Sequence, residues 1–344
     1  MKPKPLNLVA ALGALAIVVA APTSRAASGT PITSCAQTVT TNAVLTQDLN
    51  CTGAGVVVGA PGITIDLKGF TLRGDRDPGD YGIDDSAGYD NVSVKNGVLR
   101  NFAIGVFAFN GADGVSLWNL AASGNTAYGM YIDGASASVK SSAASGNSKG
   151  VLVTGDSATI QSLTASGNSV HGIVVNGDSA KILSSTASGN GATGIMVSGG
   201  SGSVSSSTAS GNGFYGIFVI GAAASVRSST ASGNAENGIA VGGASASVKS
   251  SAASGNGQTG ISVSGTSVSV SSSVASGNAM TGIGVSGDAA VITGNRAETN
   301  GFAFGASDHN GFGIYATGYT TAPVGTNVAR GNDDPSECQP ASLC

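Results

Sequence analysis

Short segments in which apolar and polar residues alternate recur along the chain. Between residues 213 and 234, one segment lies around Ile217 and Val219, a second centres on Val226, and a third spans residues 230–232. Alternation with a period of two residues is typical of β-strands, and the Gly, Ser and Asn residues between the segments favour turns. No apolar stripe with helical spacing develops, so the pattern predicts three short strands per repeat and excludes an α-helical solenoid.

A recurring tetrapeptide sets the length of this repeat. Ala-Ser-Gly-Asn occurs eight times, with Asn at positions 125, 147, 168, 190, 212, 234, 256 and 278. Successive copies are about 22 residues apart, a period typical of solenoids, in which each repeat buries its apolar side chains only by stacking on its neighbours. Three strands per coil, each pairing with its equivalent about 4.8 Å along the axis, predict an all-β fold, a single-stranded right-handed parallel β-helix.

Two positions are almost the same in every coil. The middle residue of the third strand is Ala nine times, at positions 122, 144, 165, 187, 209, 231, 253, 275 and 297. A line of small residues predicts a closely packed corner that a leucine would overpack. The Gly-Asn pair after this strand suits a turn with left-handed backbone angles, which Gly adopts freely and Asn tolerates. We expect the stacked Asn side chains to form an amide ladder with a structural role.

The N-terminus has the pattern of a secretory signal. Lys2 and Lys4 precede an apolar stretch over residues 6–21, and a small-x-small site ends at Ala26, which predicts a signal peptide at 1–26. An uncleaved anchor is the alternative, but the stretch is short for a membrane span. We therefore expect a secreted or periplasmic protein with no membrane span after cleavage.

Four cysteines bracket the repeats. Cys35 and Cys51 precede the first repeat, and Cys338 and Cys344 follow the last. Short, even-numbered pairs in an oxidising compartment usually close as local disulfides, and these spacings match no zinc motif. We expect Cys35 to pair with Cys51 and Cys338 with Cys344. The pairs would staple an N-terminal cap (27–55) and a C-terminal cap (333–344) over the open ends of a β-helix at 56–332.

Three segments carry a resemblance to a known superfamily. They are Gly62-Ile-Thr-Ile-Asp-Leu-Lys-Gly-Phe-Thr-Leu-Arg-Gly74, Tyr89-Asp-Asn-Val-Ser-Val-Lys-Asn-Gly-Val-Leu99, and coil endings such as Val291-Ile-Thr-Gly-Asn295. From about residue 35 to 332 the chain resembles secreted right-handed β-helix proteins of the pectate-lyase-like superfamily, including the periplasmic nitrous-oxide-reductase maturation type. The resemblance implies the fold. It leaves the function open, because the superfamily holds polysaccharide lyases, glycosidases, epimerases and phage tailspikes.

Charge narrows the range of partners. Charged residues make up 10% of the chain and Gly accounts for 54 of its 344 residues, so the surface is built mainly from small polar side chains. Removal of the signal peptide leaves 12 basic and 19 acidic residues, a net charge near −7. No basic stripe or motif that would neutralise phosphates is evident, so we expect no nucleic-acid binding.

An outward position on the first strand is apolar in six consecutive coils. An exposed apolar stripe usually marks a binding site or an interface, and the resemblance suggests that aromatic rings stack on sugars. Two alternatives stay open: another segment of the chain covers the stripe, or two copies associate through it. The candidate ligand-binding or interface residues, from this position and from the position before each coil's Gly, are Phe107, Tyr128, Tyr131, His171, Tyr215 and Phe218.

Six of the 19 acidic residues lie between positions 75 and 90. Within this loop, Asp84 and Asp85 are the candidate catalytic residues, because glycoside hydrolysis uses two carboxylates about 5 to 9.5 Å apart. The oxygen-rich loop is also compatible with Ca²⁺, which the resemblance implies for lyases that act beside a uronate. An ordinary solvated loop has the same composition.

Further polar residues give weaker candidates. Asp156 and Asp178 hold the same position in adjacent coils and should lie about 5 Å apart, so they could share a cation or simply occupy an exposed turn. The spacing of 32 between Asn300 and Asn332 predicts an insertion at 302–311. Its Asp308 and His309 would lie about 48 Å from Asp84, too far to share a site. With two His and paired Cys, copper delivery is disfavoured.

Paired Thr and Ser residues flank the buried Ala of the third strand, from Thr164 and Ser166 to Thr230 and Ser232. This array is similar to ice-binding solenoids, although hydroxyls that only solubilise a strand have the same appearance. We interpret the sequence as an exported β-helix protein that binds polysaccharide or acts as a surface or structural module. The alternative is a polysaccharide lyase or glycoside hydrolase, and ice binding is a minor alternative.

Overall fold

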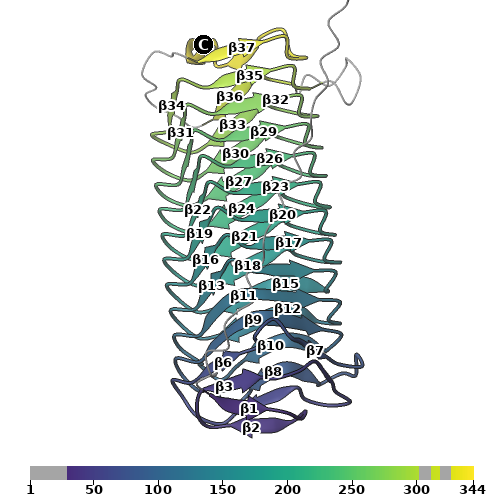
Figure 1. Cartoon of the computed structure of the whole chain (residues 1–344). Coiled ribbons are helices and arrows are strands. Elements are labelled where there is room, and N and C mark those ends of the chain that lie inside the picture. The colour runs from purple at the N-terminus through teal and green to yellow at the C-terminus, as the bar shows by residue number, and fades with distance from the viewer. Residues whose placement is uncertain (1–28, 302–310, 318–326) are drawn as a thin grey trace, which may run out of the picture.

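In the computed structural model, the described residues, 29–301, 311–317 and 327–344, wind into one parallel β-solenoid (Figure 1). The predicted signal peptide, Asp308 and His309 lie outside the described residues. The described elements are 38 short strands and one 3₁₀ helix, η1 (Ala341–Leu343), so the fold is all-β as predicted. No helix within the described ranges is long and apolar enough to span a membrane.

The strands stack into three columns, which form three faces of the solenoid. Face 1 is a 14-stranded sheet made of β2 (Gln37–Val39), β5 (Val56–Val58), β8 (Tyr81–Asp85), β10 (Ile104–Ala108), β12 (Tyr128–Asp133), β15 (Lys149–Thr154), β18 (Ile173–Asn176), β21 (Ile195–Ser198), β24 (Ile217–Ile220), β27 (Ile239–Gly242), β30 (Ile261–Ser264), β33 (Ile283–Ser286), β36 (Ile314–Thr317) and β38 (Cys338–Gln339).

Faces 2 and 3 belong to one 24-stranded sheet that bends at a corner. Face 2 is made of β1 (Thr30–Ile32), β3 (Ala43–Leu45), β6 (Thr64–Asp66), the first parts of β9 (Ser93–Arg100) and β11 (Ser116–Ser123), β13 (Ser138–Lys140), β16 (Thr159–Gln161), β19 (Lys181–Leu183), β22 (Ser203–Ser205), β25 (Ser225–Arg227), β28 (Ser247–Lys249), β31 (Ser269–Ser271) and β34 (Val291–Thr293). Face 3 is made of β4 (Leu49–Asn50), β7 (Thr71–Arg73), the last parts of β9 and β11, β14 (Ala143–Ser145), β17 (Thr164–Ser166), β20 (Thr186–Ser188), β23 (Thr208–Ser210), β26 (Thr230–Ser232), β29 (Ala252–Ser254), β32 (Val274–Ser276), β35 (Arg296–Glu298) and β37 (Val328–Arg330).

The core runs along the axis as columns of identical apolar residues. Ile217 pairs with Ile195 and Ile239 in neighbouring coils, and its side chain is fully buried. Val226 and Ala231 are also fully buried, on faces 2 and 3 of the same coil. The three predicted strands per coil are confirmed. Because side chains alternate along each short strand, the same type of residue points inward in every coil.

The corner between faces 3 and 1 is as tight as the Ala column predicts. A Cβ added at Gly216 would lie 2.6 Å from the carbonyl oxygen of Gly238 and 3.0 Å from the Cβ of Ala231. Neither atom can withdraw, since one belongs to the backbone and the other is fixed to it. Small residues at both positions are therefore what allows the coil to close.

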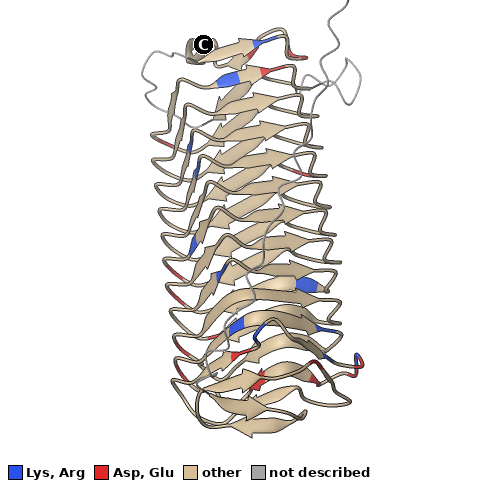
Figure 2. Cartoon of the chain, viewed as in Figure 1, with Lys and Arg blue, Asp and Glu red and all other residues tan. Residues whose placement is uncertain are grey.

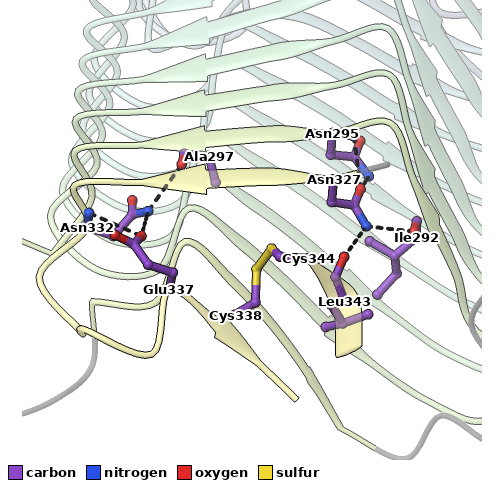
Figure 3. Close-up of a disulfide and its surroundings, with 9 residues drawn as sticks. All are labelled: Ile292, Asn295, Ala297, Asn327, Asn332, Glu337, Cys338, Leu343 and Cys344. Carbon is purple, nitrogen blue, oxygen red and sulfur yellow. Dashed lines mark hydrogen bonds between the residues drawn. A yellow bond between two sulfur atoms is a disulfide. The ribbon is translucent and has the colours of Figure 1, made fainter. Parts of the chain in front are cut away.

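The predicted amide ladder is present and fully buried. In each step the side-chain amide of one Asn donates to Oδ1 of the Asn in the next coil, at 2.9 Å from Asn212 to Asn234. At the C-terminal end the last amide, of Asn332, donates to Oε2 of Glu337 at 2.6 Å (Figure 3). A carboxylate accepts hydrogen bonds only, so it suits a chain of amides that all donate in the same direction.

The left-handed positions differ from the prediction. The Gly of each Gly-Asn pair is left-handed, as at Gly233 (φ 61°), but the ladder Asn residues are not. The other left-handed residues include Ser at the corner between faces 2 and 3, such as Ser228 (φ 48°). The residue that follows it, Ser229, accepts the backbone N–H of Ser207 and forms a second buried ladder, which the sequence analysis missed.

Both ends of the solenoid are stapled as predicted. Cys35 and Cys51 form a disulfide with Cα atoms 5.6 Å apart, and Cys338 and Cys344 form the second, with Cα atoms 6.1 Å apart. Figure 3 shows the Cys338–Cys344 disulfide beside Leu343. The carbonyl of Leu343 accepts a hydrogen bond from the side-chain amide of Asn327. Within 27–55, the strands β1 to β4 already pair in parallel with strands of the next coil.

Candidate functional site

Face 1 carries a continuous row of outward apolar side chains. Backbone pairing places the six residues in direct register, in the order Phe107, Tyr131, Leu152, Val174, Met196 and Phe218. Val174 is buried by its neighbours and the other five are partly exposed. We call this set the apolar row. It exists because the repeat keeps the same residue of the strand facing outward in every coil.

Aromatic rings cluster at the N-terminal end of the row. The ring centroid of Phe107 lies 4.3 Å from Tyr81, 5.4 Å from Phe109 and 5.6 Å from Tyr131. Tyr128 lies 5.3 Å from Tyr131. Offset rings at these distances attract one another and form a broad platform.

A second, smaller cluster lies at the other end of the row. The ring of Tyr215 lies 4.3 Å from Phe214 and 5.3 Å from Phe218. Four coils separate Tyr131 from Phe218, a distance of about 19 Å along the axis. The apolar row is thus a strip with an aromatic platform at each end.

Two ionisable residues lie beside the strip between the platforms. Lys149 Nζ is 5.2 Å from the ring centroid of Tyr128. Nδ1 of His171 accepts the backbone N–H of Thr193 at 3.3 Å. Burial, and then the charge of Lys149, lower the pKa of His171, so its ring is neutral at pH 7.

The described part of the chain leaves the platforms accessible. Phe109 is 37% exposed and Phe214 is 42% exposed, although both belong to large aromatic clusters. Tyr81, the first residue of β8, joins the first platform, and both Tyr81 and Phe107 stay partly exposed. Rings that stay this open can contact a ligand or another molecule.

Asp84 and Asp85 point in opposite directions from β8. Asp84 is partly exposed and stands in register with Phe107, at the N-terminal end of the apolar row. Asp85 is 2% exposed and stands in register with buried Ala108. The two carboxyls therefore do not face one substrate together, and a paired mechanism would need a partner for Asp84 from elsewhere.

The buried Asp85 carboxyl is an unusual group. Its Oδ1 accepts the backbone N–H of Tyr89 at 3.0 Å, while Oδ2 has no hydrogen-bond partner among the described residues. Burial, followed by the charges of Asp84 and Asp90, raises its pKa to about 6. Through its hydrogen bond to Tyr89, the Asp85 side chain stabilises the turn that follows β8.

The acidic loop contains one group of three carboxyls close enough to share a cation. Oxygens of Asp75, Asp77 and Asp80 lie within 4.8 Å of one another, and the first two residues are exposed. Slight burial and the charges of the other two raise the pKa of Asp80. Such oxygen sets suit Ca²⁺, and exposed acidic loops also occur without an ion.

Asp156 and Asp178 stack in adjacent coils as expected. Oδ1 of Asp156 accepts the backbone N–H of Asp178 at 2.8 Å, and Oδ1 of Asp178 accepts that of Gly200 at 2.6 Å. The same contact joins Asp113 to Ala135. These hydrogen bonds give the carboxylates a structural task in the turn after face 1.

On face 3 the hydroxyl columns are also in register. Thr186 and Ser188 pair with Thr208 and Ser210 of the next coil. Their Thr members are partly buried or exposed, and the Thr column stops at Ala252. Further along, the same positions are held by Arg296 and Glu298, which form an ion pair at 2.6 Å. Both hydroxyl columns are therefore complete only in the four coils from Thr164 to Thr230.

Sequence reasoning missed a groove at the corner between faces 2 and 3 near the N-terminal end. It encloses about 850 Å³, and its lining includes Lys68, Asn96, Asn119, Ser142 and Thr164. Four residues separate β6 from β7, against two in later coils, so this corner projects and forms a wall. The departure from the repeat at 67–70 was the available signal.

Together, the parallel coils, buried ladders and stapled ends define the protein's class. The chain folds as a right-handed parallel β-helix. Residues 171–333 match the family described as right-handed beta helix region, and residues 62–223 match the family described as periplasmic copper-binding protein (NosD). Among curated proteins, none matches the sequence.

Solved structures show the same fold at low sequence identity. A variant of the periplasmic alginate epimerase AlgG is similar with a TM-score of 0.61 and 14% identity, over 81% of this chain and 78% of that one. A second AlgG variant gives a TM-score of 0.58 and 11% identity over the same shares. The A-module of mannuronan C-5 epimerase AlgE4 from Azotobacter vinelandii gives 0.47 and 15%, over 85% of this chain and 90% of that one.

The side chains described do not fit a copper site. All four cysteines are in disulfides, and His171 is the only histidine within the described ranges. Copper prefers thiolate, thioether and imidazole ligands gathered at one point. His171 also uses one ring nitrogen in a backbone hydrogen bond, which leaves one imidazole nitrogen and no thiolate for a metal among the described residues.

Proposed function

We propose that this protein is exported and binds polysaccharide along the apolar row of face 1. The observation that carries the proposal is the pair of open aromatic platforms, around Phe107 and Tyr131 at one end and Phe218 at the other. The flat faces of sugar rings carry C–H groups that pack on aromatic rings, and their edges carry hydroxyls. A strip with rings at both ends and Lys149 and His171 along its side offers both kinds of contact.

Two further features support export and a polymer ligand. Two disulfides favour an oxidising compartment, in agreement with the predicted signal peptide. AlgG, similar in fold, is described as a periplasmic alginate epimerase. A linear polymer also matches the geometry, because the row continues through six coils and a small ligand would use only part of it.

The test replaces Phe107, Tyr131 and Phe218 together with Ser. Electrophoresis through gels that contain a neutral polysaccharide measures retention, and light scattering measures mass. We expect the variant to fold and to lose retention, because the contacting rings are gone. The matched control replaces Thr186, Thr208 and Thr230 of face 3 with Ala and should be retained normally.

Three results would count against binding through the row. Unfolding of the variant would mean that the rings belong to a covered part of the structure. A fall in mass from dimer to monomer would assign the row to self-association. Unchanged retention, stability and mass would show that the row is bare surface.

A second candidate function is a polysaccharide lyase or glycoside hydrolase reaction. It is favoured by Asp84, which lies at the end of the apolar row in register with Phe107. Incubation with uronate polymers and detection of unsaturated or reducing ends tests it, with Asp84→Asn as the inactive variant. Product from neither protein would remove this candidate, and equal product from both would show that Asp84 is not the catalytic residue.

A further inference from the structure

The groove at the corner between faces 2 and 3 is a second hollow surface, separate from the apolar row. Its lining extends from Lys68 to Thr164, and a smaller hollow of about 220 Å³ continues it to Asn42. Residues of six successive coils contribute, so the hollow is on the order of 24 Å long and parallel to the axis. That shape suits an extended chain.

The walls of the groove carry directional polar groups. The amide of Asn96 donates to Asp66 Oδ1 at 3.0 Å, and the amide of Asn119 donates to Asn96 Oδ1 at 3.0 Å. The contacts use one N–H of each amide, and each amide has two. Gly97 follows Asn96 and is in register with Leu120, and a Cβ there would clash with the Cβ of Leu67, so Gly is what lets the projecting wall pack.

The charge beside the groove is positive. Lys68 Nζ lies 3.2 Å and Lys95 Nζ lies 3.8 Å from Asp66 Oδ2. Burial alone would raise the pKa of Asp66, but hydrogen bonds from the Lys68 N–H and the Asn96 amide, with the Lys68 charge, hold it below its ordinary value. Asp66 is therefore ionised. Lys140 stands two coils above Lys95, so this end of the face keeps an excess of positive charge.

This positive surface is local in an acidic protein. The fold gathers onto face 2 basic residues that are dispersed in the sequence, where they form no stripe or motif. They are Lys95, Lys140, Lys181, Arg227 and Lys249, with Lys68 at the corner. Figure 2 shows blue segments on strands of this face. An anionic chain would be attracted here more strongly than to the rest of a surface that carries few charges.

Trp118 supplies an apolar contact on face 2, directly beside the groove. It is the only Trp in the chain, is 47% exposed, and stands in register between Lys95 and Lys140. It immediately precedes Asn119 of the groove lining. An outward indole contributes little to folding, whereas an indole flanked by ammonium groups can stack on a sugar while the lysines bind its acid groups.

We propose that this groove binds a linear anionic glycan, with Trp118 stacking on a sugar ring and Lys68 and Lys140 contacting its acid groups. The proposal goes beyond the proposed function, because it concerns another face and names the charge of the ligand. The acid groups are carboxylates in a uronate polymer or sulfates in a sulfated one, and the two share the same recognition chemistry.

Fluorescence of Trp118 tests the proposal directly, since no other Trp contributes. Hexagalacturonate and a heparin-derived hexasaccharide are titrated separately, with maltohexaose as the neutral control. We expect a saturable change in emission with one or both acidic hexamers, weaker at high salt, and a much smaller one with maltohexaose. Which hexamer acts identifies the acid group.

The variant Lys68→Ser/Lys140→Ser should raise Kd about tenfold, because two partly exposed charge contacts are lost. Its matched control is Arg227→Ser/Lys249→Ser, which removes equal charge on the same face about 24 Å or more from Trp118 and should bind within about twofold of wild type. If the double variant is unstable, Lys140→Ser alone takes its place.

The proposal is overturned if neither acidic hexamer changes the emission of Trp118. It is also overturned if the control Arg227→Ser/Lys249→Ser weakens binding as much as Lys68→Ser/Lys140→Ser, or if hexathymidylate binds as strongly as the glycans. The triple Ser variant of the apolar row separates this site from the proposed function. A Trp118 response that persists in it while neutral polysaccharide is no longer retained supports two sites. A response that disappears there, with the fold intact, would assign the glycan to face 1.

Discussion

Removing one amide from the buried Asn ladder tests the main stabilising feature of the coils. The side chain of Asn212 donates to Asn234 Oδ1 at 2.9 Å and to the carbonyl of Ala187 at 3.2 Å. It also accepts the backbone N–H of Asn190 at 3.1 Å and its side-chain amide at 2.9 Å. Asn212 is 2% exposed, so water does not replace these contacts in the folded state.

The expected cost of Asn212→Ala follows from these four hydrogen bonds. Each contributes about 1 kcal/mol to the free energy of unfolding, and the buried N–H of Asn190 loses the acceptor it had. We therefore expect a loss of about 4 kcal/mol. Ser210→Ala in the same coil removes an outward hydroxyl and should change stability by less than about 0.5 kcal/mol.

Asn212→Asp tests the hydrogen-bond donors of the amide while keeping the size and shape of the side chain. The new carboxyl keeps an acceptor for Asn190 but presents a second oxygen to the Ala187 carbonyl and to Asn234 Oδ1, which are both acceptors. Burial and these dipoles raise its pKa in the folded state. Its stability is therefore highest below the unfolded pKa, when the carboxyl can donate, and falls as the pH rises.

Urea unfolding followed by far-UV circular dichroism at pH 4 and pH 7 measures all three variants. At pH 7 the Asp variant should be less stable than the Ala variant, and the gap should narrow or reverse at pH 4. An Ala variant within about 1 kcal/mol of wild type would refute the assignment of stability to the ladder. An Asp variant insensitive to pH would show that the site is hydrated.

Two further predictions concern the core and the buried acid. Ala231→Leu should cost about 2 kcal/mol in urea unfolding, because Gly216 and the next coil leave no room at that corner; a neutral effect would mean that the corner opens readily. For Asp85 the folded pKa of about 6 exceeds the ordinary 3.8, so its stabilising effect is complete below 3.8 and is lost as pH rises through about 6. Asp85→Asn should therefore gain up to about 3 kcal/mol at pH 8 and little at pH 4 in thermal or urea unfolding, and an equal effect at both pH values would contradict this.

The repeat made most of the fold predictable. Once the period is known, the same residue must face inward in every coil, so the sequence alone determines the Ala231 corner and the Asn212 ladder. The insertion was also predictable from spacing, since Ile261 pairs with Ile283, whereas Ile283 pairs with Ile314, a longer step along the chain. Periodicity carries this information because stacked strands allow one register.

The candidate sites were less predictable, because they depend on departures from the repeat. Alternation assigned Asp84 to the outside but did not show that Asp85, its neighbour, would be buried with an unpaired oxygen. Trp118 was overlooked because β9 and β11 run through the corner that divides faces 2 and 3 in later coils, which hides the period. The basic residues of face 2 are far apart in sequence and meet only through stacking.

Large outward side chains are the strongest indication of where this protein acts. Most outward positions are Ser, Thr, Ala or Gly, which is sufficient to keep a strand face soluble. Phe107, Phe218 and Trp118 replace such residues at positions where the coil would close equally well without them. An exposed ring adds little to folding and increases the tendency to aggregate, so its presence needs a contact that the isolated chain does not supply.

The two faces that carry these rings also carry Lys149 and Lys140, respectively, and acidic residues line the turn between them at Asp113, Asp156 and Asp178. Because that turn would repel an anionic chain, a glycan bound on one face is not expected to cross to the other, and each face should bind its own ligand.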